Sequence, residues 1–313
     1  MKTINPFEFS DTNKRYYTYD YYLKRRFGGK CFKVPLDGGF TCPNRDGSKG
    51  TGGCTYCSER GSGDFTCTPD MSITKQFEIC RNGLLKKWPS EKYIAYFQAF
   101  TGTYAPTERL RELFEEALSQ KGVVGLSVAT RGDCVTPETA QYLKELSKRT
   151  FLTVELGLQS VHDETAKRIN RCHTYAEFLT GYNMLDGVNR CIHIINGLPG
   201  ENRDMMMQNA KEVAKLHPEF LKIHLLHVLR GTALAKQYES GEFDVMTREE
   251  YTNLVCDQLE IMPPDTVIGR VTGDGAKDAL IAPLWSLKKF VVMNEIDKEL
   301  VRRGTYQGIY YGK

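Results

Sequence analysis

The stretch VVGLSVATRGDCVTPETAQYLKELSKRTFLTVELGL, residues 123–158, contains the pattern on which the predicted fold rests. Its two ends, 123–129 and 151–158, are short apolar runs rich in β-branched residues, which is typical of buried strands. Between them, Thr136 and Pro137 begin a helical segment, because threonine is a good N-cap and proline is favoured at the first helical position. A strand, a helix and a second strand in this order predict a parallel βαβ unit.

The same alternation of apolar runs and helical segments continues on both sides of this stretch. Apolar runs at 93–97, 190–195 and 220–226 predict three more strands, with the nearly continuous apolar character of a parallel sheet. The segments 107–120 and 202–217 have apolar residues at the spacing of one helix face. Strands that alternate with helices in this way predict a parallel sheet covered by helices.

A strand near 32–36 brings the count to about six βα units, and their spacing of roughly 30 residues fits a (βα) barrel. We therefore predict an α/β fold with a partial (βα)6 TIM-like barrel over 31–230. A short N-terminal extension over 1–30 precedes the barrel, and an α/β C-terminal tail over 231–313 forms a substrate-side extension. In such folds the loops at the carboxyl ends of the strands carry the chemistry.

The composition limits the class of protein more than its function. Of 313 residues, 41% are apolar, which is enough for a large core. The formal net charge of +3 is too small to predict nucleic-acid binding and does not exclude it. No run of about 18 apolar residues predicts a membrane span, and the N-terminus lacks an apolar signal core. We expect a cytoplasmic protein whose ten cysteines form no disulfides.

Three of the cysteines lie in the glycine-rich stretch CPNRDGSKGTGGCTYC, residues 42–57. Cys42, Cys54 and Cys57 allow three interpretations. In the first they hold a structural zinc ion, with Cys67 as a fourth ligand, and in the second the C-x-x-C pair is a redox disulfide. In the third, three thiolates hold an iron–sulfur cluster and leave one iron open for a substrate. The spacing alone leaves all three interpretations open.

Four further motifs follow on the later predicted βα units. They are ELGLQS at 155–160, KRINRCH at 167–173, NGLPGE at 196–201 and KIHLLHVLRGT at 222–232. Together with Cys-x11-Cys-x2-Cys, and in this order, they resemble the radical S-adenosylmethionine (SAM) superfamily. The resemblance is greatest to its elongator-catalytic-subunit-like branch and the stand-alone bacterial YtqA/YhcC-type members. It extends from about Cys42 to Gly273, and the acetyltransferase domain of the elongator subunit has no room in this chain.

The resemblance implies a radical SAM enzyme with two cofactors. Cys42, Cys54 and Cys57 would hold a 4Fe–4S cluster, and SAM itself would be the ligand of the fourth iron. The cluster would pass one electron into SAM, and the resulting 5′-deoxyadenosyl radical would abstract a hydrogen atom from the substrate. The implied partner for this step is an electron donor such as flavodoxin or ferredoxin.

The resemblance also implies which side chains contact SAM. Tyr56 matches an aromatic position near adenine, whereas the usual glycine-rich triplet that ends in glutamate is absent after the strand at 93–97. The branch motif Thr-Arg-Pro-Asp is present at 130–133 with Gly132 in place of proline. The predicted SAM-binding residues are Tyr56, Gln98, Thr101, Gly102, Arg131, Asp133, Glu155, Gln159 and Arg171.

Two of these assignments have a plain alternative. Glu155 and Gln159 lie on one face of a predicted strand, where they would suit ribose or methionine groups, but Glu155 is also placed for a buried salt bridge. Arg171 would pair bidentately with the methionine carboxylate, or it is a surface arginine.

Three residues are candidates for the catalytic site. His193 and Lys222 lie within apolar strands, where ionisable side chains are rarely idle, although a histidine there is often a satisfied core residue. Cys134 ends a strand that faces the predicted cavity, where it is either a thiol on the substrate side or a packing residue.

The resemblance implies tRNA as the substrate, modified on the wobble-uridine side chain in a carboxymethylaminomethyl to aminomethyl-type step. Basic clusters with aromatic residues at 23–27, 85–88, 286–290 and 301–313 suit phosphate contacts and base stacking, but they also suit solvated faces. Two alternatives remain, a radical SAM enzyme that acts on a small metabolite and a non-catalytic binding protein with a zinc loop.

Overall fold

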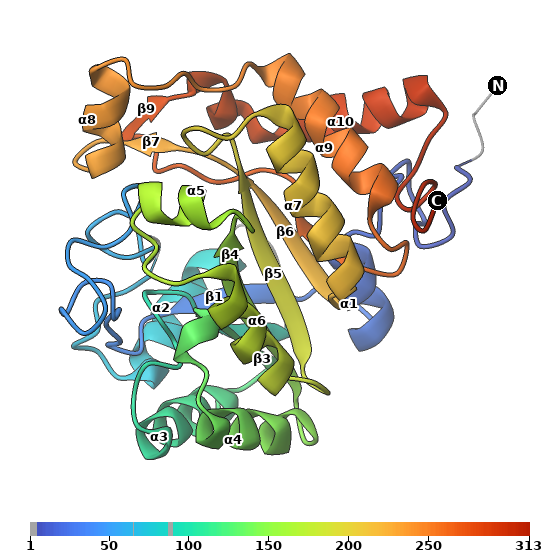
Figure 1. Cartoon of the computed structure of the whole chain (residues 1–313). Helices are drawn as coiled ribbons and strands as arrows, with labels where there is room; N and C mark the ends of the chain where they lie inside the picture. Colours follow the sequence, from blue (N-terminus) through green and yellow to red (C-terminus); the bar gives the residue numbers. More distant parts are fainter. Residues whose placement is uncertain (1–4, 65, 87–89) are drawn as a thin grey trace. The chain divides into compact units, whose positions relative to one another are not determined.

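The computed structural model describes residues 5–64, 66–86 and 90–313 (Figure 1). The basic cluster predicted at 85–88 therefore lies partly outside the described residues. Seven strands form one sheet in the order β1-β2-β3-β4-β5-β6-β8. They are β1 Phe32–Leu36, β2 Tyr93–Phe97, β3 Val123–Thr130, β4 Phe151–Gln159, β5 Asn189–Asn196, β6 Phe220–Leu225 and β8 Val267–Arg270.

The predicted α/β partial-barrel fold is confirmed, because the first six strands lie in the sheet in chain order and helices separate them. Pairing is parallel for β1 with β2, β2 with β3, β3 with β4, and β6 with β8. The seventh strand, β8, comes from the segment expected to be a C-terminal tail. A short second sheet pairs β7 Val228–Leu229 with β9 Leu280–Ala282 in antiparallel orientation.

The chain divides into two compact units, which are described separately. The cysteine-loop unit comprises Leu23–Leu158 and Asn170–Cys191, and the C-terminal unit comprises Met1–Tyr22, Gln159–Ile169 and Ile192–Lys313. The expected division at residues 30 and 230 remains a prediction.

The cysteine-loop unit contains α2 Ile73–Leu85, α3 Thr107–Leu118, α4 Pro137–Ser147 and α6 Tyr175–Met184. Thr136 accepts a hydrogen bond from the amide of Thr139, with Pro137 at the first helical position, so the predicted start of α4 is confirmed. Every residue of β2 is buried, and Phe97 packs against Phe114 of α3 with ring centroids 4.9 Å apart. The apolar face predicted for 107–120 thus covers the sheet.

The C-terminal unit contains α5 Asp163–Arg168, α7 Arg203–Leu216, α8 Ala233–Glu239, α9 Arg248–Ile261, the 3-10 helix η2 Leu284–Lys288 and α10 Lys289–Arg303. Helix α1 Tyr19–Phe27 begins in this unit. Three side-chain hydrogen bonds join residues near the two chain ends to the rest of the C-terminal unit. Gln307 donates to the carbonyls of Pro263 and Thr266, and Arg15 donates to the carbonyl of Thr305. None of the described helices is both long and apolar enough to cross a membrane.

Candidate functional site

The loop that follows β1 carries the three clustered cysteines and contains several backbone turns. Tight turns join the amide of Arg45 to the carbonyl of Cys42 at 2.8 Å and the amide of Cys57 to the carbonyl of Cys54 at 2.9 Å. Gly53 has φ +79°, and a Cβ there would lie 2.7 Å from Nε of Arg45, so this turn requires glycine. The Arg45 guanidinium in turn donates to the carbonyl of Ser58 at 2.6 Å and closes the loop.

The three loop thiols are free and half-buried, which suits ligation of a soft metal by thiolate. Burial raises the pKa of the Cys57 thiol to about 12, so binding of a metal must release this proton. The side-chain NH2 group of Asn44 lies 3.6 Å from Sγ of Cys54. Hydrogen bonds to ligand sulfur atoms adjust the properties of a bound metal centre. The donor chemistry therefore fits an iron–sulfur cluster.

The described residues include no set of three His, Cys, Asp or Glu side chains placed to hold a metal ion. The ligand roles of Cys42, Cys54 and Cys57 thus remain a prediction. Cys67, the fourth ligand of the zinc interpretation, has its sulfur 3.6 Å from that of Cys80 in α2. This neighbour gives Cys67 a local partner outside the loop.

Residues 170–177, which lie more than 100 positions further along the chain, form hydrogen bonds with the cysteine loop; we call them the clamp segment. The Asn170 side chain donates to the carbonyls of Thr51 at 3.1 Å and Gly53 at 2.8 Å, and Asn44 donates to the carbonyl of Asn170. A Cβ on Gly50 would lie 2.8 Å from Sγ of Cys172, so glycine at this position allows the two segments to approach.

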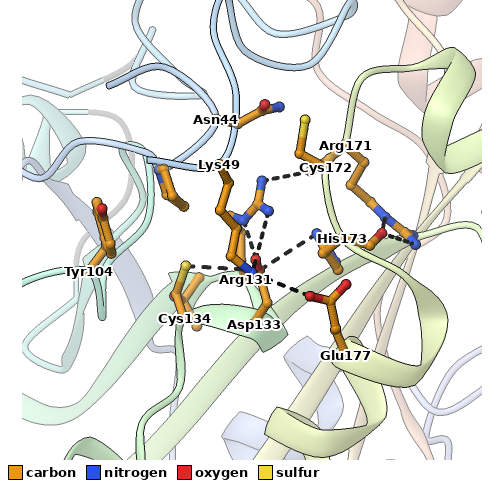
Figure 2. Close-up of polar contacts among 12 residues, drawn as sticks. Asn44, Lys49, Tyr104, Arg131, Asp133, Cys134, Arg171, Cys172, His173 and Glu177 are labelled. Carbon is orange, nitrogen blue, oxygen red and sulfur yellow. Dashed lines mark hydrogen bonds and ion pairs between the residues drawn. The ribbon is translucent and has the colours of Figure 1, made fainter. Parts of the chain in front are cut away.

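A buried carboxylate joins the clamp segment, the cysteine loop and the end of β3 (Figure 2). Asp133, whose side chain is 2% exposed, accepts two bonds of 2.9 Å from Arg131, and Lys49 of the loop lies 2.8 Å from its second oxygen. Lys49 also lies 3.5 Å from Glu177 of the clamp segment. Arg131 further donates to the carbonyl of Arg171 at 2.9 Å.

The protonation state of Asp133 follows from these contacts. Burial by itself raises the pKa of a carboxyl group, but the hydrogen bond from Arg131 and the neighbouring positive charge lower that of Asp133 to about 2. The carboxylate is therefore ionised at neutral pH and holds both cations. Arg131 and Asp133 were predicted to contact SAM, and the structure shows in addition that Asp133 pairs with both Arg131 and the loop residue Lys49.

His173 lies next to this carboxylate and was not predicted as a site residue. Its Nδ1 is 3.6 Å from Asp133, and within the described part of the chain neither of its buried ring nitrogens has a hydrogen-bond partner. Burial, followed by the positive charge of Arg171, lowers the pKa of His173 to about 3, so the ring is neutral. Its place in the motif KRINRCH was the one signal in the sequence.

Arg171 is fully buried, which excludes the surface alternative. Its guanidinium donates to the carbonyl of His173 at 2.9 and 3.1 Å and to the carbonyl of Leu158. These bonds fix the backbone of the clamp segment to the end of β4. Its predicted contact with the SAM carboxylate remains a prediction.

Glu155 of β4 takes part in a buried network with three residues that sequence analysis missed. It pairs with Lys33 of β1 and accepts hydrogen bonds from Ser127 at 2.7 Å and from the Tyr96 hydroxyl at 2.9 Å. The Lys33 ammonium also lies 4.4 Å from the centre of the Tyr96 ring. The buried salt bridge considered for Glu155 is thus present, whereas its contact with SAM stays a prediction.

The predicted residues after β2 and β3 lie in tightly packed turns. The Gln98 amide donates to the carbonyl of Ser62 at 2.8 Å, and Thr101 is buried. Gly102 packs so closely that a Cβ would lie 2.7 Å from the carbonyl oxygen of Ala129. Cys134 is buried, with its sulfur 3.9 Å from Asp133.

The other predicted side chains belong mostly to the C-terminal unit. Gln159 ends β4 with φ +60°, a left-handed conformation. His193 of β5 is half-buried and lies against His224 of β6, and Lys222 of β6 is buried. Tyr56, in the cysteine-loop unit, is half-buried and lies near the thiol of Cys54.

Comparison with known proteins gives two family matches and several relatives. Residues 45–213 match the Radical SAM superfamily, and residues 218–302 match the Radical_SAM C-terminal domain. The first match includes Cys54, Cys57, Asp133 and the whole clamp segment. YtqA of Bacillus subtilis is 52% identical over 99% of this chain and 97% of its own length.

A more distant relative and a solved structure cover less. The protein named tRNA uridine(34) acetyltransferase of Methanocaldococcus infernus is 29% identical over 54% of this chain and 33% of its own length. The structure of Elp3 from the same organism superposes with a TM-score of 0.65 at 19% identity, covering 88% of this chain and 64% of that one. That likeness shows the fold alone.

Proposed function

The chain belongs to the radical SAM superfamily, and from this premise we propose that it modifies the side chain of the wobble uridine in tRNA. Membership makes it an enzyme that uses a 4Fe–4S cluster and SAM. When bound, these cofactors supply hydrogen-atom abstraction, which removes hydrogen from unactivated C–H bonds. The predicted family and cofactors are thereby confirmed, and the substrate is the part that we propose.

The observation that supports the cofactor assignment on this chain is that other segments of the unit fix the cysteine loop in position. In our proposal Cys42, Cys54 and Cys57 bind three irons, and Asn44 and Tyr56 adjoin the sulfur of Cys54. Lys49, Asp133 and Asn170 keep the loop in place, because each joins it to a buried part of the unit. The residues predicted to contact SAM stay candidates within this proposal.

Two observations support tRNA as the substrate. A relative that covers half of this chain carries tRNA uridine(34) in its name. The segments expected to bind nucleic acid present exposed aromatic and basic side chains, among them Phe290 at 70%, Tyr310 at 47% and Arg302 at 73% exposure. Aromatic faces stack on unpaired bases, and arginine pairs with phosphate. The proposed step is remodelling of carboxymethylaminomethyluridine towards aminomethyluridine, and the proposed electron donor is flavodoxin or ferredoxin.

The first test concerns the cofactors. The protein is purified without oxygen, reconstituted with iron and sulfide, and incubated with SAM and dithionite while 5′-deoxyadenosine is measured. Wild type should be brown and form 5′-deoxyadenosine, and a variant with Cys42, Cys54 and Cys57 changed to Ala should do neither. Cys31→Ala, which removes a half-buried thiol outside the loop, is the matched control and should behave as wild type. A colourless wild type that contains zinc would refute the catalytic assignment.

The second test concerns tRNA. Mass spectrometry of tRNA nucleosides from a deletion strain should show accumulation of the carboxymethylaminomethyl form, and the purified enzyme should reverse it. Binding of tRNA should weaken steeply with added salt, because phosphate contacts release counterions. Normal nucleosides in the deletion strain, together with salt-independent binding, would favour the small-metabolite alternative.

A further inference from the structure

Two cysteines outside the cysteine loop lie in direct contact with each other. Cys67, in the segment that precedes α2, has its sulfur 3.6 Å from that of Cys80 on α2. Both thiols are free and half-buried. A disulfide bond is about 2.05 Å long, so the two sulfur atoms need to approach by only about 1.5 Å to form one. We call Cys67 and Cys80 the thiol pair.

The thiol pair has the composition of a redox couple and not that of a metal site. Zinc in proteins takes at least three protein ligands. Within the described ranges of the chain, no set of three His, Cys, Asp or Glu side chains is placed to hold a metal ion. Two thiols in contact can instead form a disulfide, and disulfides of reducing compartments are mostly transient, catalytic or redox-sensing.

Cys80 lies on a helix that is fixed to its neighbours. Gln76, one turn before it, is fully buried; its side chain accepts a hydrogen bond of 2.8 Å from the amide of Asp37 and donates one of 2.8 Å to the carbonyl of Asp37. Thr74 donates from its amide at 2.8 Å and from its hydroxyl at 2.9 Å to Glu116 of α3. The movement that closes the S–S bond therefore falls on the side of Cys67.

Cys67 lies in a loop that a small reagent can reach. The three residues after it, 68–70, are exposed. The exposed Arg60 donates to the carbonyl of Cys67 at 3.1 Å, which places a positive charge beside this cysteine. Glutathione is an anion at neutral pH, so this charge favours its approach. Thirteen positions separate the two cysteines, and the ring that a disulfide would close is therefore local.

The two thiols differ in reactivity. Burial, followed by the hydrogen bond with Cys67, raises the pKa of Cys80 to about 12. Because the thiolate is the nucleophile in thiol–disulfide exchange, Cys80 attacks a reagent in solution slowly. Its contact with Cys67 compensates for this in a second, intramolecular step, where the reacting atoms are already together.

We propose that the thiol pair is a site of reversible disulfide formation, with a low-molecular-weight disulfide such as oxidised glutathione as the oxidant. First, Sγ of Cys67 attacks a sulfur of oxidised glutathione, whose S–S bond breaks; one reduced glutathione leaves with the proton of Cys67. Sγ of Cys80 then attacks Sγ of Cys67, and the second reduced glutathione leaves with the proton of Cys80. The pair loses two electrons, which reduce one oxidised glutathione to two thiols. The product ties the loop of Cys67 to α2.

This inference goes beyond the proposed function and does not depend on it, since the thiol pair includes none of the three predicted cluster ligands. The test equilibrates the reconstituted protein, without oxygen, in glutathione buffers from fully reduced to fully oxidised. Samples are quenched in acid, alkylated with N-ethylmaleimide and mapped by peptide mass spectrometry, which identifies each cysteine and so separates the thiol pair from the loop cysteines.

In oxidised buffer, wild type should lose two of its ten thiols and give one peptide pair linked through Cys67 and Cys80, and dithiothreitol should restore both thiols. Cys80→Ser should stop at a glutathione adduct on Cys67, and Cys67→Ser should form no link. Cys31→Ser, which removes a half-buried thiol of the same unit outside the pair, is the matched control and should form the disulfide as wild type does.

Hydrogen exchange of residues 66–72 gives a second readout. It should slow on oxidation in wild type and in Cys31→Ser, because the disulfide restrains the loop, and stay unchanged in Cys80→Ser. Retention of all ten thiols by wild type in oxidised buffer, glutathione adducts without the link, or a link from either cysteine to a different one would each overturn the proposal. The peptide map of wild type decides this alone if a variant fails to fold.

Discussion

Replacement of Asp133 by Asn tests the central contact of the cysteine-loop unit. The change keeps the shape of the side chain but removes the charge that pairs with Arg131 and Lys49. The amide accepts at most one of the two bonds from Arg131 and turns its NH2 group towards a cation. Arg131 would then keep its bond to the carbonyl of Arg171 and at most one bond to the amide, but it would lose the carboxylate that pairs with its charge.

Two estimates bound the cost of this change. A pKa lowered from 3.8 to about 2 means that Asp133 contributes about 2 kcal/mol in its charged form. Removal of one partner from a buried ion pair typically costs about 3–5 kcal/mol. We therefore expect Asp133→Asn to lower the free energy of unfolding by about 3 kcal/mol. Hydrogen exchange of residues 42–57 should rise as well, because Lys49 loses its buried anchor.

The assay is urea unfolding of the cluster-free protein in reductant, followed by circular dichroism. Glu177→Gln is the matched control, since it removes the other partner of Lys49 at a half-exposed position. Glutamine can still serve the capping box with Thr174, so this control should cost less than about 1 kcal/mol. Equal losses in the two variants, or unchanged hydrogen exchange of the loop in Asp133→Asn, would refute the reasoning.

Three further predictions use the same unit. Asn170→Gly removes two hydrogen bonds to the loop, and glycine can adopt the φ of +52° found at this position. We expect the free energy of unfolding to fall by about 2 kcal/mol and the loss of iron to a chelator to become faster. Iron loss at the wild-type rate would contradict this prediction. Gly102→Ala puts a Cβ against the carbonyl of Ala129 and should lower stability by about 1–3 kcal/mol, whereas Gly29→Ala, with nothing within 4 Å, should be near neutral by urea unfolding. Because the pKa of Asp133 is lowered in the folded state, its contribution to stability is present above about pH 4 and is lost as the pH falls towards 2. The stability of Asp133→Asn should therefore lack this loss between about pH 4 and 2 in an acid unfolding experiment. Identical acid unfolding profiles of wild type and variant would contradict the prediction.

The fold was predictable because its signals are local. Apolar runs, the threonine cap and the proline of α4 lie within one βα unit, and the sheet follows chain order. The pairing of β8 with β6 was not predictable, because nothing in the local sequence of a strand from the tail indicates which strand it will pair with. The cysteine loop was visible because glycine and cysteine cluster there in a short stretch.

The partners of the site were not predictable, because they depend on contacts between distant segments. Asn170 reaches Thr51 across 119 residues of chain, and Lys33 reaches Glu155 across 122. The partners in these two contacts cannot be identified until the register of the sheet and the path of the clamp segment are known. Glu155 could be read as a salt-bridge residue from its apolar strand, but nothing in the sequence indicates Lys33 as the other half.

These long-range contacts explain why a glycine-rich loop can serve as a cofactor site. A loop with several left-handed glycines is mobile by itself, whereas the site must hold reacting groups to within fractions of an ångström. In this chain Lys49 ties the loop to Asp133, and Asn170 ties two of its carbonyls to the clamp segment. Asp133 is itself fixed by Arg131, whose other donor reaches the carbonyl of Arg171. The rigidity of the loop thus comes from β3 and the clamp segment, so a change at 131, 133 or 170 should disturb the cofactor site without touching a cysteine.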